Sequence, residues 1–319
     1  MILNVVLIVV GIALVLWGAD RLTEGASALA RRMNVSEMVI GLTIVAAGTS
    51  APELFVSLVS ALKGTPDLAV GNVVGSNIMN TLIIVGITAM VAPIAIARQT
   101  VAKDVPFTIA ASVLLMVLAL DDFSTLNLWG NVIGRIDGLL LMLGFAAFMY
   151  YTFSVAHPDD SSQTAVKQQN AWLSATFVVL GLVCLIVGSN LFVDNASAVA
   201  ATLGVSDSVI GLTIVAGGTS LPELATSVVA ARKGRSAMAI GNVIGSNVFN
   251  ILMILGLTAI VCPMQIGGIT LVDMSMMVVS MLLLWFFSYT KLTVARWEGA
   301  VMTALYMGYL AWLLYNLHL

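Results

Sequence analysis

Long apolar runs alternate with short polar connections along nearly the whole chain. Each run is about 18–25 residues long, which suits α-helices that cross a bilayer, whereas the strands of a membrane β-barrel are about half as long and alternate in polarity. The longest polar connection, residues 156–171, separates a first half, 1–155, from a second half, 172–319. We predict an all-α integral membrane protein with ten transmembrane helices, over residues 2–20, 36–62, 67–91, 103–120, 135–155, 172–191, 206–231, 236–261, 271–290 and 298–317.

The composition agrees with this fold class. The chain is 60% hydrophobic and only 9% charged, whereas a soluble domain carries about 25% charged residues. The first apolar run has no basic region before it and no evident small-residue cleavage site, so we expect a retained helix rather than a signal peptide. Cys184 and Cys262 lie singly in apolar runs and are expected to be inert core residues.

A duplicated segment relates the two halves. Residues 41–89 and 211–259 align without gaps, and 30 of 49 positions are identical. Each copy carries the motif Gly-Thr-Ser-x-Pro-Glu, which begins at Gly48 and at Gly218. A second shared motif, Gly-Asn-x-x-Gly-Ser-Asn-x-x-Asn, begins at Gly71 and at Gly241.

The lysines and arginines predict how the helices are oriented. If the N-terminus is outside, only Lys63 and Arg135 of the 13 basic residues fall on the outside. The other eleven fall inside, which is a strong positive-inside bias: Arg21, Arg31, Arg32, Arg98, Lys103, Lys167, Arg232, Lys233, Arg235, Lys291 and Arg296. Five spans per half then make the second half inverted, with residues 156–171 as a cytoplasmic linker. Inverted repeats are typical of secondary transporters, whose sites lie near the midplane between the repeats.

Glu53 and Glu223 are the two acids that occupy equivalent positions inside these apolar runs. A carboxylate at membrane depth is expensive and indicates a functional site by default. A buried glutamate can also be a protonated structural residue, but its duplication within a duplicated polar motif favours one shared site. The acids near span ends are expected to be interfacial or capping groups: Asp20, Asp104, Asp137, Asp194, Asp273 and Glu298.

The residues around the two glutamates are suited to hard cations. Pro52 and Pro222 stand in mid-span and predict helix kinks, because proline lacks an N–H and crowds the preceding turn. Carbonyl groups one turn earlier then need another partner in hydrocarbon, and a cation is one. Hydroxyl, carbonyl and carboxylate oxygens suit Ca²⁺, Mg²⁺ or Na⁺ rather than Zn²⁺ or copper. No His or Cys lies near the motif.

Polar residues spaced four apart place a stripe on the next helix of each half. Asn72, Ser76 and Asn80 share one helical face, and the repeat places Asn242, Ser246 and Asn250 in the same way. Such a stripe on an apolar span is expected to face the protein interior. Two interpretations stay open for a further set, interhelical hydrogen bonding and direct ligation of an ion: Asn72, Asn77, Asn242 and Asn247.

Charge counting indicates exchange between ions. Two ionised glutamates carry −2, which one Ca²⁺ or two Na⁺ neutralise, and neutral oxygens can hold further Na⁺. Ions that compete for one carboxylate pair provide a physical basis for antiport. H⁺-coupled Ca²⁺ exchange is the main alternative, but it needs only the two acids, so the extra neutral ligands favour Na⁺. An intramembrane enzyme would need a Ser/His pair, two Asp or a zinc site, and the sequence shows none.

These motifs closely resemble the two α-repeats of the sodium/calcium exchanger family, within the cation:calcium antiporter superfamily, and the short central connection resembles the prokaryotic members. The resemblance implies a Ca²⁺ site of Glu53 and Glu223 with the carbonyls of Thr49 and Thr219. It implies flanking Na⁺ sites that add Ala46, Ser50, Ser76, Ala216, Ser220 and Ser246. Asn80 and Asn250 would complete the centre.

The same resemblance bears on the coupling ion and the partners. Some relatives, the potassium-dependent exchangers among them, carry Asp where this chain has Asn80 and Asn250, so K⁺ dependence is not expected here. The first two spans of each half resemble gating helices that slide during alternating access. The expected partners are Ca²⁺, Na⁺ and the bilayer of the cell inner (plasma) membrane, with no cofactor and no nucleic acid. The sequence leaves the oligomeric state undetermined.

Overall fold

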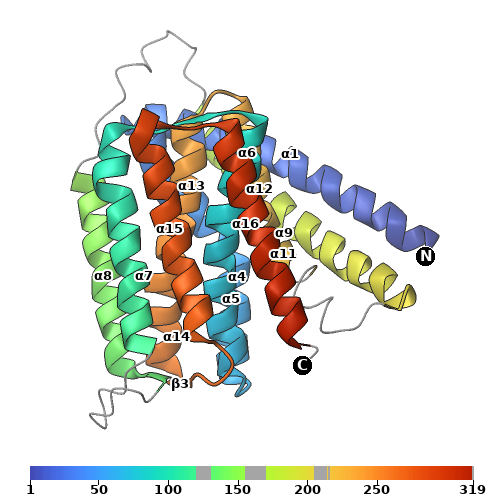
Figure 1. Ribbon diagram of the computed structural model, residues 1–319. Coiled ribbons are helices and arrows are strands. Elements are labelled where there is room, and N and C mark those ends of the chain that lie inside the picture. The colour runs from blue at the N-terminus through green and yellow to red at the C-terminus, as the bar shows by residue number, and fades with distance from the viewer. Residues whose placement is uncertain (120–130, 155–169, 205–213, 215, 318–319) are drawn as a thin grey trace.

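Helices form nearly all of the regular structure (Figure 1). The structure is a computed structural model that describes residues 1–119, 131–154, 170–204, 214 and 216–317. The predicted linker 156–171 therefore lies almost wholly outside the described residues, as does the start of the predicted span 206–231.

The first half contains the following elements, where η marks a π-helix: α1 (Ile2–Met33), α2 (Glu37–Ile40), η1 (Gly41–Val45), α3 (Ala46–Thr49), α4 (Ala51–Leu62), α5 (Pro66–Met79), η2 (Asn80–Ile84), α6 (Val85–Val91), β1 (Ile94–Ala95), η3 (Thr100–Asp104), α7 (Val105–Ala119), β2 (Val132–Ile133) and α8 (Arg135–Ser154). The second half contains α9 (Ala171–Thr202), α11 (Ala216–Thr219), α12 (Leu221–Arg232), α13 (Ser236–Val248), η6 (Phe249–Ile254), α14 (Leu255–Val261), β3 (Met264–Gln265), α15 (Leu271–Lys291), β4 (Thr293–Val294) and α16 (Arg296–Leu317). Both halves contain a broken helix followed by a continuous helix with a π-helical turn, η2 or η6, whereas η3 has no counterpart in the described part of the second half.

The helices confirm a helical membrane fold. Seven described helices are long and apolar enough to cross a membrane, and eight if the bent pair Glu37–Thr49 and Ala51–Leu62 counts as one span. These eight coincide with eight of the predicted spans. The last predicted span is also a helix, α16, and the described part of span 206–231 holds α11 and α12. The count of ten spans stays a prediction.

The predicted ends of the first and sixth spans, residues 20 and 191, are wrong. Both helices are 32 residues long and continue to Met33 and Thr202. Charged residues end the apolar run in α1, but long unbranched charged side chains are good helix formers, so the helix does not stop there. It stops where Asn34 adopts the left-handed conformation, with φ 56°, a common way to terminate a helix.

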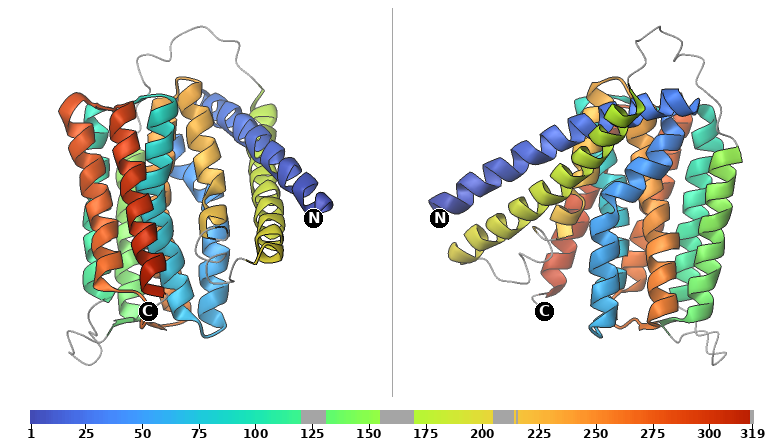
Figure 2. Two further views of the ribbon diagram at one scale, coloured as in Figure 1. Left: turned by 45° about the vertical axis from the view of Figure 1, so that its right-hand side comes forward. Right: turned by 180° about the vertical axis from the view of Figure 1, so that it is seen from behind.

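α1 and α9 pack against each other as an antiparallel pair. A Cβ built at Gly11 would lie 2.7 Å from the Gly188 carbonyl oxygen, and one at Gly18 would lie 2.7 Å from that of Gly181. Small residues at such contacts let two membrane helices approach closely. The pair leans away from the remaining helices at the end that carries the N-terminus (Figure 2).

The centre of the molecule is formed by the two continuous helices that follow the Pro-Glu motifs. In the most apolar 18-residue stretch of each helix, 78% of the residues are buried for Pro66–Val91 and 83% for Ser236–Val261. The share is 22% for α1. Their apolar residues share one core with α7, α8 and α15, as shown by the burial of Val73, Leu115 and Ile244. The asparagine stripe of each half therefore faces the protein interior, as predicted.

Two short antiparallel ribbons join the halves. In one, Ile94 of β1 pairs with Val294 of β4, and in the other Val132 of β2 pairs with Gln265 of β3. Each ribbon takes one strand from each half, so the backbone pairs across the repeat boundary outside the helices. Asp137, Asp273 and Glu298 accept backbone N–H bonds at helix starts, from Gly134, Thr270 and Ala295, which confirms the capping role predicted for these three acids.

Asp20 and Asp194 do not cap helices, because α1 and α9 extend beyond them, and their interfacial location stays a prediction. Asp20 lies within α1 and pairs with Lys233 at 2.5 Å. Asp194 lies within α9 and is exposed. Asp104 is buried at the junction of η3 and α7.

Candidate functional site

Both motif helices are interrupted at the serine before the Pro-Glu pair. α3 ends at Thr49 and α4 begins at Ala51, and the two parts of this span differ in direction by 47°. Pro52 stands in the first turn of α4 and Pro222 in the first turn of α12. Proline is favoured there because the first N–H groups of a helix have no partner in it. The prolines thus begin new helices, and Glu53 and Glu223 lie in the first turns of those helices.

The two glutamates are buried together at the interface between the two halves. Glu53 is 1% exposed and Glu223 is 0% exposed. Ser50 donates to the Glu223 carboxylate at 3.0 Å, and Ser220 donates to the Glu53 carboxylate at 3.3 Å. Each serine therefore holds the acid of the opposite half, and the side chain of Thr219 also contacts Glu53.

Glu53 Oε2 and Glu223 Oε2 are buried and lack a hydrogen-bond donor within the described residues. The same holds for the side-chain oxygens of three asparagines on the central helices, Asn77, Asn80 and Asn250. An unsatisfied buried polar group costs about 1–3 kcal/mol, and more for a charged group. Oxygen atoms without donors suit a hard cation, so the arrangement has the chemistry that such an ion needs.

Asn80 and Asn250 belong to π-helical turns, η2 and η6. Single π-turns occur mostly inside α-helices, frequently at functional sites. Both asparagines are buried, and the Asn250 amide has no hydrogen-bond partner at either atom among the described residues. The hydrophobic pattern did not indicate these turns.

Asn72 and Asn242 form two equivalent interhelical clamps. The Asn72 amide donates to the Glu53 carbonyl oxygen at 3.3 Å and to Ser57 Oγ at 3.0 Å. The Asn242 amide donates to the Glu223 carbonyl oxygen at 3.3 Å and to Ser227 Oγ at 3.0 Å. Of the two interpretations left open above, the structure therefore shows interhelical hydrogen bonding for both. Ser57 and Ser227 are participants that sequence reasoning missed, although each follows its glutamate by four residues in both repeats.

Asn247 links the two central helices. Its side-chain oxygen accepts from the Asn80 amide at 3.1 Å, and its own amide donates to Thr81 Oγ1 at 2.9 Å. Asn77, its counterpart in the first half, donates to the Val73 carbonyl of its own helix at 2.7 Å. The two halves thus differ in how this second pair of asparagines is used.

Two further residues implied by the resemblance contact a glutamate or its serine partner. Ser246 donates to the Glu223 carboxylate at 3.5 Å, and Ser220 contacts Ser76 at 3.4 Å. The Ala46 carbonyl accepts from the Ser50 N–H at 3.0 Å and from the Thr49 hydroxyl at 3.4 Å, so it carries helical bonds as well. Ala216 begins α11, four residues before Ser220.

The glycines of the two Gly-Thr-Ser-x-Pro-Glu motifs allow α9 to pack closely against the broken helices. A Cβ built at Gly48 would lie 2.5 Å from Leu182 Cδ2, and one at Gly218 would lie 1.9 Å from Val193 Cγ2. α9 therefore packs directly on both broken helices. The stiff β-branched Val193 can yield less than the end of a leucine, so the second contact tolerates less change.

We expect the Asn72→Ala substitution to destabilise the fold by about 1–3 kcal/mol, because the Ser57 hydroxyl and the Glu53 carbonyl lose a buried donor. The check is unfolding of the purified protein in detergent, with Ser57→Ala and the double variant completing a cycle. A coupling of about 0.5–3 kcal/mol between Asn72 and Ser57 is expected. Asn250→Ala is the matched control, since this amide has no partner among the described residues, and its stability change should be smaller. Additive effects of the two clamp substitutions would contradict the contact.

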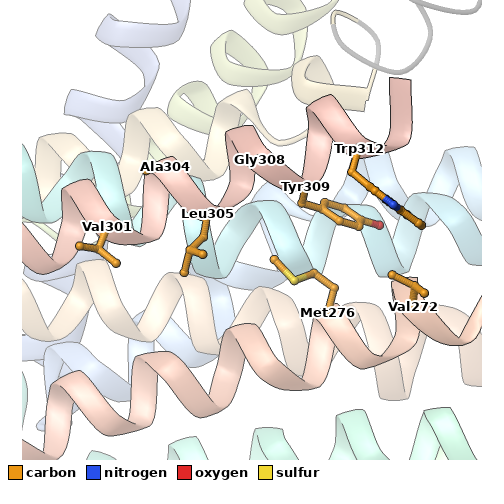
Figure 3. Close-up of a pocket in the computed structure, with 8 residues that line it drawn as sticks. All are labelled: Val272, Met276, Val301, Ala304, Leu305, Gly308, Tyr309 and Trp312. Atoms are coloured by element: carbon orange, nitrogen blue, oxygen red, sulfur yellow. The ribbon is translucent and has the colours of Figure 1, made fainter. Parts of the chain in front are cut away.

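A large surface hollow lies elsewhere and has different chemistry. About 590 Å³ in volume, it lies between α15 and α16 and is lined by Val272, Met276, Leu305 and Trp312, among others (Figure 3). Tyr309, which lines it, donates a hydrogen bond to Asp273 at 2.6 Å. Such an apolar groove has no ligand set for a cation, so the buried glutamate pair remains the candidate site.

Comparison with known proteins agrees with the fold and the motifs. The family model for sodium/calcium exchanger protein matches residues 3–154 and 173–315. The chain is 42% identical over 271 residues to the putative antiporter CaxA of Alkalimonas amylolytica, with 82% of each chain covered. It is 33% identical to the sodium/calcium exchanger MaX1 of Methanosarcina acetivorans, over 98% of this chain and 99% of that one.

Solved structures of the sodium-calcium exchanger NCX_Mj are also similar. One, soaked with 2.5 mM Na⁺ and 0.1 mM Ca²⁺, superimposes with a TM-score of 0.83 at 32% identity, covering 98% of each chain. These relatives are exchangers or antiporters by name and not enzymes. The duplicated motifs, the helical membrane fold and the family match together show that this chain belongs to the sodium/calcium exchanger protein family.

Proposed function

We propose that this protein is a secondary active antiporter that exchanges Ca²⁺ for Na⁺ across the cell inner (plasma) membrane. It works by alternating access to one site near the midplane. The chain spans the membrane ten times as two inverted five-helix repeats, residues 1–155 and 172–319, with the N-terminus outside and the linker 156–171 in the cytoplasm. Family membership, the similarity to NCX_Mj and the positive-inside pattern support this arrangement.

One observation carries the proposal: two buried carboxylates from opposite halves each accept a hydrogen bond from a serine of the other half, and one oxygen of each lacks a donor among the described residues. The unpartnered oxygens give a cation its strongest ligands. Among the described residues no cluster of three or more His, Cys, Asp or Glu side chains could hold a metal ion. Neutral oxygens therefore supply the rest of the coordination, which suits an ion that must leave again.

The site assignment follows the resemblance to the family, applied to equivalent positions of the two repeats. Glu53 and Glu223, with the carbonyls of Thr49 and Thr219, bind Ca²⁺. Asn80 and Asn250 complete this centre. The flanking ligands hold Na⁺ around it: Ala46, Ser50, Ser76, Ala216, Ser220 and Ser246. The two carboxylates balance one Ca²⁺ or two Na⁺, so either load can neutralise the site, whereas the empty charged site does not readily cross. This competition couples the two fluxes.

Flux measurements in proteoliposomes test the proposal. Vesicles loaded with Na⁺ and diluted into Na⁺-free medium with Ca²⁺ should take up Ca²⁺, and vesicles loaded with choline should not. A pH gradient imposed without Na⁺ is the second arm. Ca²⁺ uptake driven by that gradient alone would overturn Na⁺ coupling in favour of H⁺ coupling. K⁺ on either side should leave the Na⁺-driven rate unchanged, because Asn80 and Asn250 add no third charge.

A further inference from the structure

The two ends of the α1–α9 pair meet the other helices differently. Near the N-terminus of α1 the pair leans away (Figure 2). A hollow of about 340 Å³ lies there between α1, α9, α6 and α12, lined by apolar side chains that include Ile12, Ile87 and Phe192. The C-terminal half of α1 instead makes polar contacts with the turn between α12 and α13.

Those contacts form a network of ion pairs. Lys233 of the turn contacts Asp20 at 2.5 Å and Glu24 at 3.6 Å, and Arg235 contacts Glu37 at 3.7 Å. We call these five residues the latch. All five ion pairs among the described residues involve at least one member of the latch, and the remaining partner is Arg21 of α1.

Further hydrogen bonds, to backbone carbonyls and between side chains, reinforce the latch. Arg235 donates to the Thr23 carbonyl at 2.6 Å, and Lys233 donates to the Asp20 carbonyl at 3.3 Å. Ser27 donates to Glu37 as well. The turn therefore contacts both side chains and backbone carbonyls of α1. The latch side chains are only partly exposed, from 22% for Arg235 to 35% for Glu24. Partial burial protects such pairs from screening by salt.

The repeat shows that the latch is one-sided. The positions of the second half equivalent to Asp20 and Glu24 are Asn190 and Asp194, and those of the first half equivalent to Lys233 and Arg235 are Lys63 and Thr65. Neither Lys63 nor Asp194 forms an ion pair in the described part of the chain. Two otherwise equivalent corners thus differ in charge pairing, and inversion places them on opposite faces of the membrane.

We infer that the latch holds the α1–α9 pair against the α12–α13 turn and so favours the state that is closed on the cytoplasmic face. The inference rests on the proposed function, since it assumes that this pair moves during alternating access. Lys233 and Arg235 are positioning residues in it: they touch no ion and act by setting the balance between two states. Releasing the latch raises the fraction of molecules open to the cytoplasm, and the apparent affinity on that face rises with that fraction.

The first test measures Ca²⁺ affinity on each face in proteoliposomes of known orientation. Lys233→Gln with Arg235→Gln should lower the half-saturating Ca²⁺ concentration on the cytoplasmic face by about three- to tenfold, as expected for the loss of a few partly buried pairs. The half-saturating Ca²⁺ concentration on the extracellular face should not fall. Lys63→Gln is the matched control and should leave the half-saturating concentration unchanged on both faces. The charge exchange Asp20→Lys with Lys233→Asp should keep the cytoplasmic half-saturating concentration of the unaltered protein.

An unchanged cytoplasmic affinity, or an equal change on both faces, would overturn the inference. A second readout needs no ion flux: spin labels at Arg32 of α1 and Arg232 of α12, both exposed and outside the latch, in a protein with Cys184→Ser and Cys262→Ser. The latched protein should give one short distance, and the double glutamine variant should add a longer one. If Ca²⁺ flux were absent in the unaltered protein, the proposed function would fail, and these distances alone would still decide whether the latch holds α1.

Discussion

Ca²⁺ flux is expected to fall by at least about 100-fold when either Glu53 or Glu223 is replaced by glutamine. A carboxylate about 4 Å from a cation contributes about 4 kcal/mol per unit of cation charge at an effective dielectric constant near 20, and each 1.4 kcal/mol is tenfold in affinity. Glutamine keeps the volume and one oxygen, so the hydrogen bond from the serine of the opposite half is retained. The loss is therefore one of charge, and the protein should remain folded.

The measurement is the initial rate of Na⁺-driven Ca²⁺ uptake in proteoliposomes, with the unfolding temperature in detergent as the check on folding. Asp194→Asn is the matched control, since this acid is exposed on α9 and forms no ion pair in the described structure. It should keep the full rate. Normal uptake by both glutamine variants would remove the site assignment.

The opposite effect on affinity is expected from Asn250→Asp. A third carboxylate at the site should tighten apparent Ca²⁺ binding by about 10- to 100-fold, because Coulomb attraction to a divalent ion adds several kcal/mol at close range. Turnover should slow, since a site charged −3 stays charged −1 with Ca²⁺ bound. Exchange should then depend on an extra monovalent cation or a proton. Asn250 is the better position for this change because its amide makes no hydrogen bond within the described residues.

Asn80→Asp provides the comparison for that experiment. The Asn80 amide donates to the Asn247 side-chain oxygen at 3.1 Å, and an aspartate there would set two acceptors against each other. It should cost stability as well as add charge, whereas Asn250→Asp should add charge alone. Ca²⁺ binding and uptake, measured with and without K⁺ and at two pH values, separate the two variants. Equal Ca²⁺ affinity in the Asn250→Asp variant and the unaltered protein would show that residue 250 lies away from the bound ion.

Span boundaries show where prediction from sequence reaches its limit. The length of an apolar run indicates which residues can lie in the hydrocarbon core of a bilayer. For this reason eight predicted spans coincide with helices that can cross a membrane. An apolar run does not indicate where a helix ends. α1 continues for 13 residues past the predicted end at residue 20 because its charged residues pair with Lys233 and favour the helix.

The candidate site shows a similar division. The two glutamates could be predicted because a carboxylate at membrane depth costs free energy, so a duplicated one indicates a functional site. The stripes that include Asn80 and Asn250 could be predicted from their spacing of four residues, which places them on one helical face. The clamps through Ser57 and Ser227 could not be found that way, since serines four residues from a glutamate are common on any helix. The π-turns at Asn80 and Asn250 leave no mark in the apolar pattern, because both neighbouring helices are buried on nearly all sides.

By itself the sequence determined the membrane class, the duplication and the identity of the two acids, since each of these depends on composition or on a comparison of the chain with itself. Only the tertiary structure decided that Ser50 donates to Glu223 and Ser220 to Glu53, and that the latch joins α1 to the α12–α13 turn. These contacts join residues far apart in sequence. Their geometry depends on how the two halves pack, and local periodicity carries no information about that packing.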